Sequence, residues 1–93
     1  MQHIIQEFEG IDSEASLRSF LLKNKFRLAD SRSHADQFVL GAFVGTLDGR
    51  QAKITHRLLD ESKELPSHNQ AGNHLRLEME GIPPIDVWFR GTY

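Results

Sequence analysis

The stretch QFVLGAFVGTLDGRQAKITHRLL, residues 37–59, contains two apolar-rich runs joined by Asp48-Gly49. An Asp-Gly pair between such runs is a strong signal for a two-residue β-hairpin turn, because a type I′ turn needs positive φ at both central positions. The turn fixes the facing pairs of the hairpin, which are Leu47 with Arg50, Gly45 with Ala52, Phe43 with Ile54, Gly41 with His56 and Val39 with Leu58. We therefore predict that this hairpin is the centre of the fold.

The two faces of the predicted hairpin differ in character. Successive side chains of a strand point to opposite faces, so one face of the hairpin is mostly apolar. On the other face Lys53, Thr55 and Arg57 of the second run lie opposite apolar residues of the first. His56 falls on the apolar face, where it is either a hydrogen-bonded core histidine or a buried catalytic base. Gly41 and Gly45 either leave room for His56 and a covering helix or mark a bulge.

The overall composition is that of a single ordinary globular domain spanning residues 1–93. The chain is 39% apolar and 26% charged, with a formal net charge of −2 and no cysteine. A chain of this size buries roughly 60–65% of its unfolded surface, which is enough for one thin core. The absence of cysteine excludes disulfides, thiolate zinc sites and a cysteine nucleophile. The charge provides no general attraction for a polyanion, so nucleic-acid binding would need a local basic patch.

Residues 1–10 lack the basic start and long apolar run of a signal peptide, and no stretch reaches the length of a membrane span. We therefore expect a cytoplasmic protein with no membrane partner. No motif indicates a cofactor.

The other segments complete a small sheet with one helix. Residues 2–9 are interpreted as a strand, and residues 13–23 as a helix with Ser13 as its N-cap, an apolar stripe, and Asn24 as a left-handed stop. Residues 26–29 form a short strand, whereas 30–36 and 60–73 are polar loops. Alternating residues predict two final strands, around 75–79 and 85–89, joined by a turn over residues 80–84.

This order of elements, β-α-β-β-β-β-β, predicts an α+β fold. We expect a mainly antiparallel sheet of five to six strands with one helix packed on one face.

The last two strands place a tryptophan on the polar side of the sheet. If Leu77 faces Val87, then Arg76 faces Trp88 in a cation–π pair and Glu78 faces Asp86 as a like-charge pair. Trp88 is then covered by the loop 60–73, covered by a partner or a second copy of the chain, or part of a small-molecule pocket. A homodimer that pairs along the final strand is one expected outcome, because little chain follows that strand to cover it.

The function hypotheses rest on this polar face. We expect a small non-enzymatic protein-protein interaction domain, such as an adaptor, inhibitor or regulatory protein, that binds another protein or itself. Its candidate binding residues are Lys53, Arg57, Arg76, Trp88, Arg90 and Tyr93. One alternative is single-stranded nucleic-acid binding, with Trp88 as a stacking platform. A second alternative is a small hydrolase that uses His56, or a metal bound by His68 and His74 with Glu61 or Glu64. We assign no catalytic residue, since no motif supports a reaction class.

Overall fold

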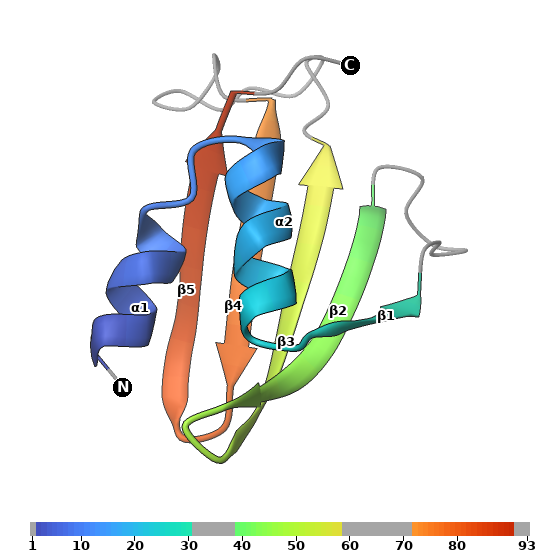
Figure 1. Cartoon of the computed structure of the whole chain (residues 1–93). Coiled ribbons are helices and arrows are strands. Elements are labelled where there is room, and N and C mark those ends of the chain that lie inside the picture. The colour runs from blue at the N-terminus through green and yellow to red at the C-terminus, as the bar shows by residue number, and fades with distance from the viewer. Residues whose placement is uncertain (1, 31–38, 59–71, 91–93) are drawn as a thin grey trace.

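The computed structural model describes residues 2–30, 39–58 and 72–90. The described elements are α1 (Gln2–Glu9), α2 (Glu14–Lys23), β1 (Arg27–Asp30), β2 (Val39–Leu47), β3 (Arg50–Leu58), β4 (Asn73–Met79) and β5 (Ile82–Phe89). The strands form one antiparallel sheet in the order β1-β2-β3-β4-β5, and both helices lie on the same face of it (Figure 1). The predicted α+β class with an antiparallel sheet is confirmed. Most of the predicted loops, residues 30–36 and 60–73, lie outside the described residues.

The first element is a helix, so the prediction of a strand over residues 2–9 is wrong. Ile4 and Phe8 are four residues apart, which places them on one side of a helix. Phe8 is 0% exposed and Ile4 packs against the core. The adjacent pair Ile4 and Ile5 lacks the strict alternation that a half-buried strand requires. The described part of the chain therefore has two helices and five strands.

The second helix follows the sequence prediction closely at its start. Ser13 is the N-cap, and its Oγ accepts a hydrogen bond from the Ser16 amide at 3.0 Å, while the Ser16 Oγ accepts one from the Ser13 amide at 3.0 Å. This reciprocal capping box satisfies two amides that otherwise lack partners. Leu17, Phe20 and Leu21 are buried along one stripe, as predicted.

The end of α2 differs from the prediction. Asn24 has φ −98° and is the C-cap, whereas the left-handed residue is Lys25, with φ 60°. The Lys25 amide donates to the Leu22 carbonyl at 3.2 Å, and the Phe26 amide donates to the Leu21 carbonyl at 2.9 Å. These two bonds form a Schellman motif, in which the left-handed position is one residue beyond the cap.

The central hairpin is confirmed. Asp48 and Gly49 have φ values of 52° and 76°, as a type I′ turn requires. The predicted partners agree from Leu47 and Arg50 to Gly41 and His56. A bulge between Val39 and Gly41 then shifts the register, so Val39 pairs with Arg57 instead of Leu58.

The last hairpin has a different register from the predicted one. The β4–β5 turn consists of Glu80 and Gly81, because Met79 pairs with Ile82 and Gly81 has φ 86°. The two prolines after the turn therefore belong to β5 and not to the connection. Proline has no N–H to donate, and it is tolerated there because β5 is an outer strand of the described sheet.

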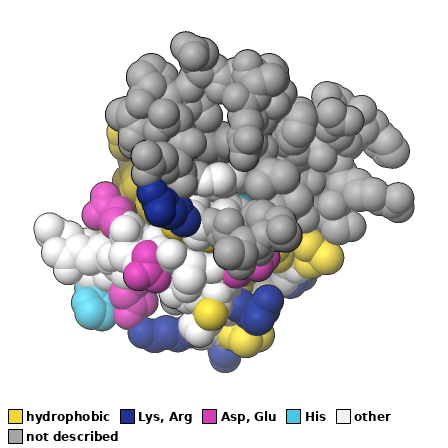
Figure 2. Space-filling view, turned by 90° about the horizontal axis from the view of Figure 1, so that it is seen from above, with side chains coloured by type: hydrophobic (Ala, Val, Ile, Leu, Met, Phe, Trp, Pro, Cys, Tyr) yellow, Lys and Arg dark blue, Asp and Glu magenta, His cyan; other side chains and the backbone are white. Residues whose placement is uncertain are grey.

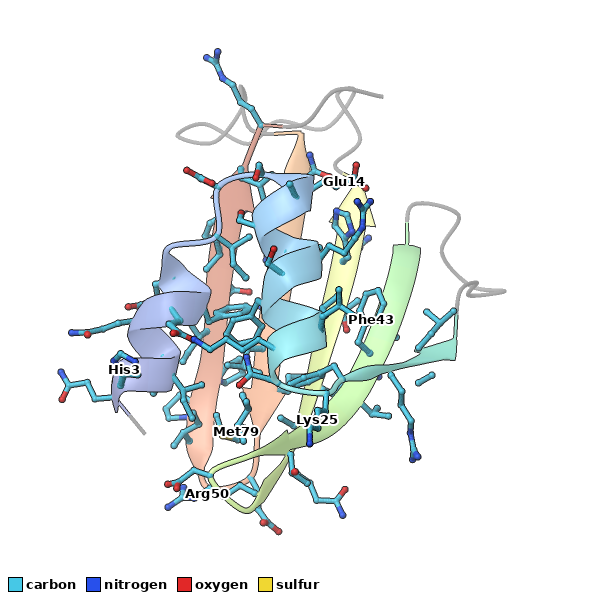
Figure 3. The ribbon with its side chains drawn as sticks, in the orientation of Figure 1. His3, Glu14, Lys25, Phe43, Arg50 and Met79 are labelled. Carbon is cyan, nitrogen blue, oxygen red and sulfur yellow. The ribbon has the colours of Figure 1, made fainter. Side chains whose placement is uncertain are left out.

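The core lies between the helices and the inner face of the sheet. The buried residues are Phe8, Ile11, Leu17, Phe20, Leu21, Leu47, Ala52, Ile54, Leu75, Leu77, Met79, Val87 and Phe89. Figure 3 shows Phe43 and Met79 on the helix side of the sheet. The rings of Phe8 and Phe20 meet edge to face at 5.8 Å, which joins the two helices through an aromatic contact.

Gly41 and Gly45 make room for aromatic rings and not for His56. A Cβ atom would come within 3.1 Å of the Phe43 ring at Gly41 and within 3.1 Å of the Phe26 ring at Gly45. The sequence interpretation that Gly41 accommodates the opposite histidine is thus wrong, although the bulge expected as the alternative does begin beside it.

The outer surface of the helix layer is mixed in character. Figure 2 shows basic, hydrophobic and acidic side chains next to one another along the lower border of the view. Leu22 on α2 is 72% exposed and Leu28 on β1 is 57% exposed. None of the helices in the described ranges is long and apolar enough to cross a membrane.

Candidate functional site

The face of the sheet that points away from both helices contains most of the predicted site residues. We call it the open face. Among the strand residues that alternate with the buried ones, it includes Arg27, Val44, Lys53, Thr55, Arg57, His74, Arg76, Glu78, Asp86 and Trp88. No helix of the described chain lies on this side (Figure 1). Lys53, Arg57, Arg76 and Trp88 are therefore brought onto one surface, as predicted.

The register of β4 and β5 builds a polar cluster around the tryptophan. His74 faces Trp88, and Arg76 faces Asp86. The imidazole of His74 stacks on the indole with ring centroids 4.8 Å apart and an interplanar angle of 23°. We call these four residues the Trp88 cluster.

Asp86 holds the cluster together. Its Oδ1 accepts hydrogen bonds from His74 Nε2 at 2.8 Å and from Arg76 Nε at 2.9 Å. The histidine ring is thereby fixed in the plane that stacks on Trp88. The indole consequently has a rigid support on one face, and one aromatic surface of Trp88 is already occupied.

The interactions within the cluster lower the pKa of the Asp86 carboxyl group and raise the pKa of the Arg76 guanidinium. Partial burial raises the pKa of Asp86, but the hydrogen bonds and charges of Arg76 and His74 lower it more, so the net pKa lies below the ordinary value of 3.8. The hydrogen bond from Arg76 to Asp86, together with their attraction, raises the pKa of Arg76. Asp86 is thus stabilised in its charged form.

Two sequence-based pairings on this face are wrong because the register is shifted by two residues. Arg76 pairs with Asp86 and not with Trp88, so the expected cation–π pair is replaced by an ion pair and by the His74–Trp88 stack. Glu78 does not face Asp86; its neighbour on β3 is Lys53. The like-charge pair that the sequence predicted is therefore absent from the described sheet.

Among the residues named above, the open face has an excess of positive charge. Its basic side chains are Arg27, Lys53, Arg57 and Arg76, and its carboxylates are Glu78 and Asp86. The chain as a whole has a formal net charge of −2, so this surface has the opposite sign to the molecule. Over α1, α2 and the turn between them, acidic residues outnumber arginine and lysine. The acidic residues are Glu7, Glu9, Asp12 and Glu14, and the basic ones are Arg18 and Lys23.

Two further predicted residues are not part of the described open face. Arg90 is exposed and directly follows β5. Tyr93 lies outside the described residues, and so does His68, one of the two metal-ligand candidates.

The histidine on the apolar face is buried and hydrogen-bonded. His56 is 5% exposed, and its Nε2 lies 2.8 Å from Oδ1 of Asn73, whose Nδ2 donates to the Phe89 carbonyl at 3.4 Å. The His56 ring also packs 5.8 Å from the Phe89 ring. This arrangement favours the core-histidine interpretation, since a general base needs access to a substrate.

The described residues give no support for a metal centre. Within the ranges 2–30, 39–58 and 72–90, no group of three or more histidine or carboxylate side chains is placed to hold a metal ion. His74, the other candidate ligand, instead binds Asp86 and stacks on Trp88.

Sequence reasoning did not identify His74 and Asp86 as partners of Trp88. Gly81 is the residue in the sequence that could have indicated these partners. A two-residue turn of Glu80 and the left-handed Gly81 sets the observed register of β4 and β5. No protein-family model, curated protein or solved structure matches this chain.

Proposed function

We propose that this chain is a small non-enzymatic interaction domain, and that its open face binds an acidic segment of another protein. The observation that supports the proposal most directly is the Trp88 cluster on a surface of positive charge. Tryptophan and arginine are the residue types most enriched at the energetic centres of protein interfaces. Here a rigidly supported tryptophan lies on the same surface as Arg57 and Arg76.

Charge complementarity favours an acidic partner. The basic excess of the open face attracts carboxylates, and this attraction increases the rate of encounter and selects against basic partners. Two copies of the chain stacked face to face would place like charges together, so this form of self-association is disfavoured. The indole of Trp88, which stacks on His74, lies on the same surface as these cations.

A nucleic acid fits the same surface less well. Glu78 and Asp86 lie among the basic side chains, and a nucleic acid has a phosphate at every nucleotide, so some of its phosphates would come close to these carboxylates. An acidic segment of a protein can have carboxylates only where the open face has cations. The stack with His74 also occupies one face of the only tryptophan, which leaves less of the ring for stacking on bases.

Fluorescence tests the proposal directly, because Trp88 is the sole tryptophan of the chain. The protein would be titrated with a glutamate-rich peptide containing leucine, with the same peptide in which lysine replaces glutamate, and with oligothymidylate. We expect saturable change in Trp88 emission with the acidic peptide, weakened by added salt. Saturation only with oligothymidylate would favour the nucleic-acid alternative. No change in Trp88 emission with either the glutamate-rich peptide or oligothymidylate would refute the proposal.

The second candidate is pairing of two copies along β5. This strand is an outer strand of the described sheet, and such edges readily pair with another chain. Pro83 and Pro84 lack amide hydrogens, so pairing would be confined to the part of β5 after them. A dimer of this kind would join two open faces into one surface and is compatible with the first candidate.

Light scattering coupled to gel filtration tests the dimer. Trp88 lies on β5, so we expect Trp88→Ala to weaken dimerisation and to lower the average molar mass measured at a given concentration. Arg18→Ala, on α2, should leave this mass unchanged. A wild-type mass that remains monomeric at high micromolar concentration would exclude the second candidate.

A further inference from the structure

A basic groove lies at the opposite edge of the sheet, where the chain leaves α2 and enters β1. The groove has a volume of about 690 Å³ and is lined by Lys23, Asn24, Lys25, Arg27, Val44, Gly45, Thr46 and Gln51. Three of these side chains are cationic and none is acidic. Figure 3 shows Lys25 at the point where the chain crosses from the helix to the sheet.

Only part of this positive charge is neutralised. Lys23 Nζ lies 2.6 Å from Glu7 Oε2, so Lys23 has a carboxylate partner. Within the described part of the chain, neither Lys25 nor Arg27 forms an ion pair. The groove therefore presents two uncompensated cations beside the neutral polar side chains of Thr46 and Gln51.

The backbone at Lys25 is a second, independent observation. Lys25 occupies the left-handed position of the Schellman motif, with φ 60°, where glycine is strongly preferred and a side chain is disfavoured. A lysine near a helix C-terminus is favoured by the helix dipole, but α2 already has Lys23 in its last turn. The helix dipole thus does not explain a cation at the left-handed position. Non-glycine residues in the left-handed conformation often occur at binding sites.

We propose that this groove is a binding site for an oxyanion, with Lys25 and Arg27 as its charged ligands and Thr46 and Gln51 as neutral donors. A lysine ammonium and an arginine guanidinium are both strong donors to phosphate and carboxylate oxygens. Arg27 also belongs to the open face, so the groove adjoins the surface proposed above. Lys25 lies off that face, so its substitution tests the groove without changing the open face.

Nuclear magnetic resonance titration at constant ionic strength tests the site. Inorganic phosphate and acetate are added to separate samples of ¹⁵N-labelled full chain, and a phosphoserine peptide and its unphosphorylated form to two others. We expect saturable amide shifts confined to residues 23–27, 44–46 and 51 with phosphate, acetate or both. Response to the phosphoserine peptide but not to its unphosphorylated form would identify a protein-borne phosphate as a source.

The substitution Lys25→Gly separates binding from folding. Glycine accepts the left-handed conformation, so the variant should be no less stable than the wild type, yet it should bind the anion about three- to tenfold more weakly. Arg18→Gln removes a cation of α2 that does not line the groove and should leave the affinity unchanged. Undiminished binding in Lys25→Gly, or shifts spread over all basic residues in the wild type, would overturn the proposal.

Discussion

At the scale of single residues, the fold depends on a few backbone positions in the left-handed region. Within the described ranges, Asp48 and Lys25 are the non-glycine residues with positive φ. Asp48 was predictable, because it precedes Gly49 in a turn sequence that requires this conformation at both positions. Lys25 was not predictable, because a lysine there opposes the usual preference and Asn24, a common left-handed residue, stands beside it.

The central turn can be tested by substitution of Gly49. We expect Gly49→Val to lower the free energy of unfolding by more than about 1 kcal/mol, because a β-branched residue resists φ of 76°. No atom outside the adjacent residues lies within 4 Å of the added Cβ, so the cost would come from the backbone and not from a clash. Gly49→Asn, which tolerates the conformation, is the control. Urea unfolding with equal midpoints for Gly49→Val and wild type would disprove the turn assignment.

The ion pairs of Asp86 predict how stability depends on pH. Because its pKa is lower in the folded protein than the ordinary value of 3.8, folding is favoured by its charged form. The contribution of Asp86 to the free energy of unfolding is complete above the pKa that Asp86 has in the unfolded chain. It is lost as the pH falls through the lower pKa that Asp86 has in the folded protein.

We therefore expect Asp86→Asn to be less stable than the wild type at pH 6, with a difference that narrows as the pH is lowered to 3. Thermal unfolding at several pH values measures this difference, and Thr55→Ala, a neutral change on the same face, is the control. A difference that stayed constant or widened toward pH 3 would contradict the role given to Asp86.

At the scale of secondary structure elements, the start of α2 was predictable from local rules. Its N-cap was identified correctly because Ser13 precedes an apolar stripe of helical period. The nature of α1 was misjudged because a separation of four residues places Ile4 and Phe8 on one side of a strand as well as of a helix. The spacing therefore did not distinguish the two structures. Burial of Phe8 against α2 then favours the helix, which is a tertiary effect that a short segment does not reveal.

The capping box of α2 provides a test at this scale. We expect Ser13→Ala to lower the free energy of unfolding by about 1 kcal/mol, because the Ser16 amide loses its acceptor. Ser19→Ala changes an exposed residue inside the same helix and should have little effect or a slightly favourable one. Chemical denaturation of both variants gives the comparison. Equal stabilities would contradict the assigned cap.

The candidate site was predicted in its composition but not in its pairings. Alternation along β3, β4 and β5 was sufficient to bring Lys53, Arg76 and Trp88 onto one face. The partners across strands depend on the register, and two prolines near the turn suggested a longer connection than the observed Glu80-Gly81. A register change of two residues keeps every side chain on its face while it replaces every neighbour. This is why the residues were assigned to the face on which they lie, whereas the His74–Trp88 stack was missed.

At the scale of the whole molecule, the two sides of the sheet differ in composition. The helices and the apolar face form the core, with His56 and Asn73 as its buried polar pair. The open face combines the Trp88 cluster with an excess of positive charge on a molecule of net charge −2. The basic groove at the β1–β2 edge shares Arg27 with the open face and extends the positive charge to Lys25. We infer that acidic ligands approach the molecule from the sheet side and the β1–β2 edge.

The most direct test of the proposed binding surface compares two variants that change the total charge equally. Lys53→Glu alters the open face, whereas Arg18→Glu alters the exposed surface of α2. Both residues are exposed and both variants lower the net charge by the same amount, so only the position of the change differs. The measurement is the dissociation constant for the glutamate-rich peptide, obtained from Trp88 fluorescence at fixed ionic strength. We expect Lys53→Glu to weaken binding at least about fivefold relative to Arg18→Glu, and equal dissociation constants for the two variants would contradict the assignment of the open face as the binding surface.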